Sequence, residues 1–207
     1  MNTTQSEIDE TARRSIGARR NPASQEAILD AAEAILREDG IAGFSIEAVA
    51  RRARAGKPTI YRWWPNRTAL MLDVYKRFKN ARAFPDTGTL RGDLIAFLEN
   101  QLLGFWKDRL CGTVYRAVIA EAQNDADAAK ALFAYQAERK SVALGMVERA
   151  KARGEVDEAV NGELIIDMVV SFAWHQLLLD RVEESMGSIE GVVDGMLMGC
   201  AGFRAGL

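Results

Sequence analysis

The stretch Ser45–Trp64, SIEAVARRARAGKPTIYRWW, decides how this chain is expected to fold. Its first half carries apolar side chains at Ile46, Val49, Ala50 and Ala53. The spacing i, i+3, i+4, i+7 places them on one face of an α-helix. The segment therefore predicts a short amphipathic helix that packs against another element.

A second short helix is expected after a turn. Gly56 interrupts the helical pattern, and Pro58 lies where the first turn of a helix tolerates a missing N–H. Pro65 ends this helix near Trp64, because the residue before a proline is pushed out of the helical conformation. Two short helices joined by a glycine-containing turn form a helix-turn-helix, whose second helix enters the major groove of DNA.

The face that the second helix leaves exposed suits nucleic acid. Lys57 and Arg62 can neutralise phosphates or donate to guanine, and Thr59 and Tyr61 can bond phosphate or base edges. No acidic residue lies between positions 51 and 67. The alternative is a solvated charged face on which the aromatic side chains only cover the core.

Helical patterns continue on both sides of the motif. Ser24 is expected to cap a first helix that ends at Gly40, and Asn66 a fourth that runs to about Phe84. Five further helices are expected at about 90–108, 111–124, 126–153, 162–184 and 188–204. The prediction is an all-α fold of about nine helices, with three parts: a flexible basic arm (1–23), a DNA-binding domain (24–84, motif about 45–64) and a helical ligand-binding and dimerisation domain (85–207).

Charge separates the two larger parts. The 207 residues carry a net charge of −2, yet residues 1–84 hold 15 Lys and Arg against 10 Asp and Glu, and residues 85–207 hold 12 against 19. A basic block joined to an acidic remainder is typical of a nucleic-acid-binding module with a second domain.

Several classes of protein are not expected. No apolar stretch approaches the ~18 residues that span a bilayer, the N-terminus is polar, and two cysteines build no disulfide framework, so we expect a cytoplasmic protein. One histidine and two distant cysteines match no metal spacing, and no phosphate-binding loop is present. We expect no metal, no cofactor and no catalytic residue.

The run Phe44–Leu70, FSIEAVARRARAGKPTIYRWWPNRTAL, resembles the N-terminal domain of TetR-type transcriptional regulators, with a likeness that extends over about residues 24–80. Its most specific elements are the Thr59-Ile60-Tyr61 step, the aromatic Trp64 and the Asn66-Arg67 start of the next helix. Beyond residue 80 the likeness is looser, although the helical remainder has the right length.

The chain departs from the family pattern at three positions. Gly56 stands where serine is common, Pro58 where a small residue is common, and Arg67 where lysine is common. Gly56 and Pro58 lie on the DNA-reading face, so we expect them to shift sequence preference. Arg67 keeps the charge but offers a planar fork.

The resemblance implies DNA contacts by Lys57, Thr59 and Tyr61, and a phosphate contact by Arg67. With their neighbours, the predicted DNA-binding residues are Ser45, Arg54, Lys57, Pro58, Thr59, Tyr61, Arg62, Trp63 and Arg67. The resemblance also implies a homodimer that binds a palindromic double-stranded DNA operator and releases it when a small-molecule inducer occupies the C-terminal domain.

The last two expected helices carry the predicted dimer interface. Glycines recur every fourth residue there, and such a stripe permits close approach of another helix. Packing of the same faces within one chain is the alternative. The predicted interface residues are Met168, Phe172, Leu179, Gly191, Val192, Gly195, Met196, Gly199 and Phe203.

Large side chains on the middle helices are the candidates for a ligand pocket, although such stripes also build plain cores. They are Trp106, Tyr115, Phe133, Met146, Trp174 and His175. Two other functions stay open at this point. A ligand-independent structural DNA-binding protein would have no cavity, and a helical enzyme or carrier would bind DNA without sequence preference.

Overall fold

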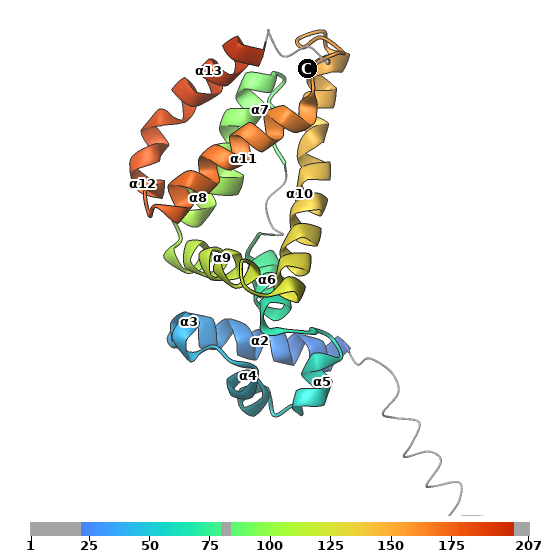
Figure 1. The fold of residues 1–207 in the computed structure, drawn as a ribbon, viewed down its shortest axis with the longest axis vertical. Helices are drawn as coiled ribbons and strands as arrows, with labels where there is room; N and C mark the ends of the chain where they lie inside the picture. The colour runs from blue at the N-terminus through green and yellow to red at the C-terminus, as the bar shows by residue number, and fades with distance from the viewer. Residues whose placement is uncertain (1–21, 80–83, 201–207) are drawn as a thin grey trace, which may run out of the picture.

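The computed structural model describes residues 22–79 and 84–200, which form an elongated helical molecule (Figure 1). The expected all-α fold is confirmed. In chain order the elements are α2 (Pro22–Glu38), α3 (Gly40–Gly43), α4 (Ile46–Ala53), α5 (Lys57–Tyr61), α6 (Arg67–Lys79), α7 (Leu90–Phe97), the π-turn η1 (Leu98–Leu102), α8 (Leu103–Trp106), α9 (Arg109–Ala122), α10 (Ala126–Ala152), α11 (Gly162–Leu178), α12 (Val182–Ser185), the 3₁₀ turn η2 (Met186–Ser188) and α13 (Ile189–Cys200).

Helices α2 to α5 form a small unit at one end of the molecule (Figure 1). Helix α2 packs on α4 and α6. Of the apolar residues predicted for the motif, Ile46, Val49 and Ala50 are buried and Ala53 is half-buried. Ile60 and Trp64 close this small core from α5 and the turn after it. The Trp64 indole donates a hydrogen bond to Asp73 at 2.8 Å, so the buried ring keeps its polar N–H satisfied.

Helix α6 leads from this unit into the larger group of helices. It packs on α2 at one side and on α9 and α10 at the other. The side-chain oxygen of Asn66 accepts a hydrogen bond from the Ala69 N–H at 2.8 Å, which satisfies one of the unpaired donors at the start of the helix.

The larger group is built along the 27-residue helix α10, which runs beside α7, α9 and α11 (Figure 1). The helix expected at 90–108 is interrupted by the π-turn η1. A Cβ at Gly104 would lie 1.7 Å from the carbonyl oxygen of Glu99, so only glycine allows the chain to pass there.

Some expected helix ends differ from the structure. Helix α2 already includes Pro22 and Ala23, so Ser24 lies inside it rather than before it, and the remainder of the expected arm falls outside the described residues. Gly40 adopts the expected left-handed conformation (φ 65°), but the short helix α3 starts there. The helix expected at 162–184 ends at Leu178, since Asp180 is left-handed (φ 56°), a conformation that aspartate tolerates better than most residues.

The Asn66 cap yields a stability prediction. Asn66→Ala should lower the free energy of unfolding by about 1 kcal/mol, because the first turn of α6 loses its side-chain acceptor. Asn66→Ser keeps an acceptor and should stay within a few tenths of a kcal/mol of the parent. Urea unfolding of the three proteins would measure these free energies. An alanine variant as stable as the parent would show that the cap contributes nothing.

Candidate DNA-binding face and ligand cavity

The helix-turn-helix is fixed by local hydrogen bonds and backbone conformation. The Ser45 hydroxyl accepts a hydrogen bond from the Ala48 N–H at 3.1 Å and caps α4. Arg54 ends α4 in the left-handed conformation (φ 51°). Gly56 is extended at the start of α5, where Pro58 occupies the first turn as expected. With these contacts, α5 lies at the surface of the small unit.

The outward side of α5 carries most of the predicted DNA contacts. Lys57, Pro58, Tyr61 and Arg62 are exposed, and the Tyr61 ring is 49% accessible. Arg54 is also exposed, and Thr59 is half-buried. Trp63 is half-buried and packs against the core, with its ring centroid 6.2 Å from that of Trp64.

One acidic residue lies next to this face. Glu47 of α4 pairs with Lys57 at 2.5 Å, and both side chains are exposed. The hydrogen bond between them lowers the pKa of Glu47 and raises the pKa of Lys57. A DNA phosphate that binds Lys57 therefore has to compete with a carboxylate, which the sequence pattern did not reveal.

The guanidinium of Arg67 contacts three groups of this chain. Its guanidinium donates to the carbonyl oxygen of Ile41 at 3.1 Å, pairs with Glu121 of α9 at 3.1 Å and lies 5.6 Å from the ring centroid of Phe44. Thr68 donates a hydrogen bond to the same carboxylate. These partners hold the start of α6 against α9, and the phosphate contact expected of Arg67 stays a prediction.

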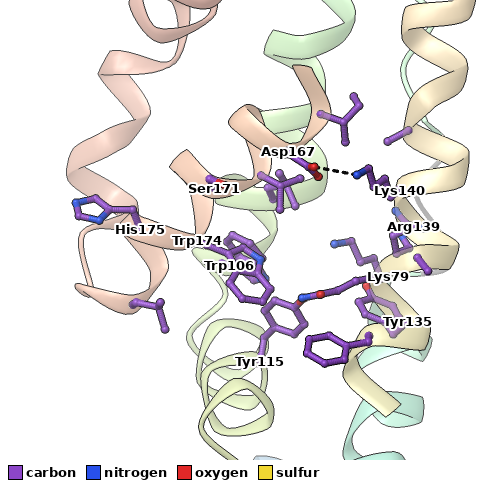
Figure 2. A pocket seen from close by; sticks show the side chains of 18 residues that line it. Lys79, Trp106, Tyr115, Tyr135, Arg139, Lys140, Asp167, Ser171, Trp174 and His175 are labelled. Atoms are coloured by element: carbon purple, nitrogen blue, oxygen red, sulfur yellow. Dashed lines mark hydrogen bonds and ion pairs between the residues drawn. The ribbon is translucent and has the colours of Figure 1, made fainter. Parts of the chain in front are cut away.

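A cavity of about 700 Å³ lies in the larger group of helices, enclosed by α6, α8, α9, α10 and α11 (Figure 2). Five of the six predicted pocket residues line it: Trp106, Tyr115, Phe133, Trp174 and His175. The sixth, Met146, is fully buried and is not among the lining residues, so this prediction is wrong. The same helical spacing is found for side chains in a core and for side chains that line a cavity, so spacing alone does not distinguish the two.

Several aromatic rings line the cavity. Trp106 and Tyr115 stack with ring centroids 5.5 Å apart, and Trp174 meets Tyr115 edge-on at 5.8 Å. Tyr135 adds a further ring at 6.2 Å from Tyr115. Burial raises the pKa of Tyr115 to about 12 and also raises the pKa of Tyr135, so both hydroxyls stay protonated near neutral pH.

Charged side chains on the cavity were not predicted. Lys79, nearly buried at the end of α6, places its Nζ 5.2–5.9 Å from the ring centroids of Tyr75, Phe105 and Trp106. Arg139 of α10 lies over the Phe84 ring. No sequence signal marks these cations, because the rings that surround them come from distant parts of the chain.

One ion pair, between Lys140 and Asp167, lies at the rim of the cavity. Lys140 pairs with Asp167 at 2.9 Å across the gap between α10 and α11 (Figure 2). His175, in contrast, points away from the centre of the cavity and is exposed (Figure 2). The cavity therefore has an aromatic interior, with Lys79 set among rings and an ion pair at its edge.

The glycine face of α13 is open. A Cβ added at Gly191, Gly195 or Gly199 would meet no atom of the described residues within 4 Å. Packing of this face within the chain is therefore not observed among residues 22–79 and 84–200. Phe203 lies outside the described residues, while the other predicted interface residues on α11 and α13 are half-buried or exposed.

None of the described helices is long and apolar enough to cross a membrane. No group of three or more His, Cys, Asp and Glu side chains in residues 22–79 and 84–200 is arranged to hold a metal ion.

Comparison with known proteins matches both parts of the chain. Residues 28–74 match the family model of bacterial regulatory proteins of the tetR family, and residues 84–196 match the tetracyclin repressor-like C-terminal domain. The uncharacterized HTH-type transcriptional regulator YdeS of Bacillus subtilis is 31% identical over 173 residues, which cover 82% of this chain and 86% of that protein. The DNA-binding transcriptional repressor TetR of Mycobacteroides abscessus is 34% identical over 157 residues, covering 74% and 81%.

A solved structure agrees. The TetR family transcription regulator SCO0332 superposes with a TM-score of 0.69 at 29% identity, covering 85% of this chain and 97% of that one. The two family models together account for the small unit with its helix-turn-helix and for the helices that enclose the cavity. The chain belongs to the TetR family of DNA-binding transcriptional regulators.

Proposed function

We propose that this regulator is a homodimeric repressor that binds a palindromic operator through α4 and α5, and leaves it when a small molecule fills the cavity. The observation that carries the proposal is that one helix, α6, touches both sites. Its first residues lie beside the helix-turn-helix, and its last residue, Lys79, lines the cavity. The proposed division is a DNA-binding domain at 24–84 and a ligand-binding and dimerisation domain at 85–207.

The exposed side of α5 supports the DNA-binding role. Lys57, Tyr61 and Arg62 are accessible together on a helix whose other side is anchored by Ile60. We assign base and phosphate contacts to this side, with Pro58, Thr59 and Trp63 next to it, and with Ser45 and Arg54 at the two ends of α4. Binding to an operator in chromosomal DNA also agrees with the expected cytoplasmic location.

The cavity favours ligand control over a ligand-independent structural role, which would need no internal space. Its volume falls in the range of small-molecule sites. A ligand shifts a conformational equilibrium only by its difference in affinity for the two states. A molecule that contacts Lys79 bears directly on α6, and Arg67 and Thr68 connect α6 to Glu121 on α9.

The open face of α13 and the adjacent part of α11 support the dimer. Two copies related by a two-fold axis would bury this face in a four-helix arrangement. A two-fold protein reads two half-sites separated by about one turn of DNA or a multiple of it. The palindromic operator follows from this symmetry.

DNA binding can be tested by fluorescence anisotropy with the DNA immediately upstream of the coding sequence and a scrambled duplex, at near-physiological salt. The parent protein should prefer the upstream DNA by about a thousandfold or more. Tyr61→Ala and Lys57→Ala should each weaken specific binding by roughly ten- to a hundredfold, and Lys57→Ala should lower the salt slope by about 1.

Lys130→Ala, which removes an exposed lysine on α10, should leave binding unchanged and serves as the control. Equal, salt-sensitive binding to both duplexes would require a selection from random DNA. If that selection also found no preferred site, or if both α5 variants bound normally, the assignment of α5 as the reading helix would be wrong.

The dimer interface can be tested with Gly195→Leu. Because the added side chain enters open space within one chain, the protomer should fold, while the two helices of a dimer would be held apart. Light scattering should then report monomers at concentrations where the parent is dimeric. Ala126→Leu adds the same side chain at an exposed site at the start of α10 and should stay dimeric. A dimeric Gly195→Leu protein would place the interface elsewhere.

Ligand control can be tested by filling the cavity. Fractions of a cell extract should include one that releases the parent protein from its preferred DNA. Val170→Trp, at a half-buried lining residue, should keep DNA binding and lose this response by at least about tenfold. Val142→Trp, at an exposed residue of α10 outside the cavity lining, should respond like the parent. If no fraction released the parent protein, ligand control would be wrong.

A further inference from the structure

The cavity has a one-sided charge. Its lining contains three cationic side chains, Lys79, Arg139 and Lys140, and a single carboxylate, Asp167. That carboxylate is paired with Lys140, which also pairs with Glu163 at 3.1 Å. The rim is therefore compensated by acidic groups, whereas the positive charge deeper in the cavity is surrounded by aromatic rings.

Arg139 is the clearest sign of a missing anionic partner. A guanidinium carries five N–H donors, and within the described residues Arg139 makes one hydrogen bond, to Gln101 at 3.0 Å. Its only ring contact there is with Phe84, at 4.4 Å from the centroid, and it forms no ion pair with a carboxylate of those residues. Arg139 is half-buried, and its remaining N–H donors can therefore bind an anionic group in the cavity.

A second, independent observation points to the same place. The Tyr135 hydroxyl is buried close to the Tyr75 hydroxyl, yet it makes no hydrogen bond of ordinary geometry with the described residues, although its ring lines the cavity. An unsatisfied buried hydroxyl is costly, and buried polar groups in native proteins are nearly always bonded. Figure 2 shows Tyr135 on the same side of the cavity as Lys79 and Arg139. A ligand group that accepts hydrogen bonds would satisfy both Tyr135 and Arg139.

From these contacts we infer that the cavity takes an aromatic carboxylate, with its rings against Trp106, Tyr115 and Trp174 and its anionic group directed toward Arg139, Lys79 and Tyr135. The inference rests on the proposed function, because it names the chemical class of the molecule that occupies the same cavity. Flat rings match the stacked and edge-on geometry of the walls. A carboxylate matches the fork of an arginine and accepts a bond from a phenol.

The test uses four probes of similar size, measured by calorimetry with the full-length protein. They are 2-naphthylacetate, the neutral 2-naphthylacetamide, the cationic 2-(2-naphthyl)ethylammonium and the saturated decahydro-2-naphthylacetate. We expect 2-naphthylacetate to bind at least about tenfold more tightly than the amide, with the ammonium weakest and the saturated acid several-fold weaker than its aromatic counterpart.

Variants locate the anion. Arg139→Gln should reduce the preference for acetate over amide to below about threefold, while Lys130→Gln, at an exposed lysine of the same helix, should preserve it. Tyr135→Phe should weaken 2-naphthylacetate several-fold with little change in the melting temperature of the free protein, because the hydroxyl that it removes makes no hydrogen bond of ordinary geometry there. A purely structural tyrosine would behave in the opposite way.

The outcomes separate this inference from the function on which it rests. If the amide or the ammonium bound as tightly as the acetate, or if Arg139→Gln kept the preference, the anionic class would be wrong and a ligand-binding cavity would stand. Equal binding of the saturated acid would contradict the aromatic class. If no probe bound while an extract fraction still released the parent protein from DNA, the inference alone would fail. If no fraction released it either, the proposed function would fail too.

Discussion

The central constraint in this molecule is that helix α6 is shared by its two halves. Tyr75, in the middle of α6, is fully buried and stacks on Tyr115 of α9 at 4.8 Å, while Phe105 and Tyr135 meet it edge-on. Its hydroxyl accepts a hydrogen bond from the Trp106 indole at 2.8 Å. A buried hydroxyl costs free energy unless it is bonded, so α6 can move relative to α8 and α9 only if this contact is lost or replaced. The aromatic cluster therefore holds α6 against α8, α9 and α10.

The two ends of α6 serve different neighbours. At its start Arg67 and Thr68 share the carboxylate of Glu121, and at its end Lys79 lies among the rings of the cavity. These ends are separated by about 18 Å along a 13-residue helix. In the proposed function, a helix of that length would move as a rigid rod, so a small displacement at Lys79 would be transmitted to the helix-turn-helix.

The helix-turn-helix could be predicted from the sequence because its determinants are local. Ser45, Gly56, Pro58 and Pro65 mark the ends of short helices, and the periodicity between them marks the buried face. The contacts of Arg67 could not be predicted, since its partners Ile41 and Glu121 lie 26 and 54 positions away in the chain.

The cavity shows the same limit. Four aromatic wall residues and His175 could be nominated from their size and helical position, but so was Met146, which packs in the core. The charged residues of the cavity could not be predicted, because only the packing of α6 against α10 places Lys79 near Arg139. Amphipathic spacing states which face of a helix is buried. It does not indicate whether that face packs against other side chains or lines a cavity, because this depends on how the helices pack together.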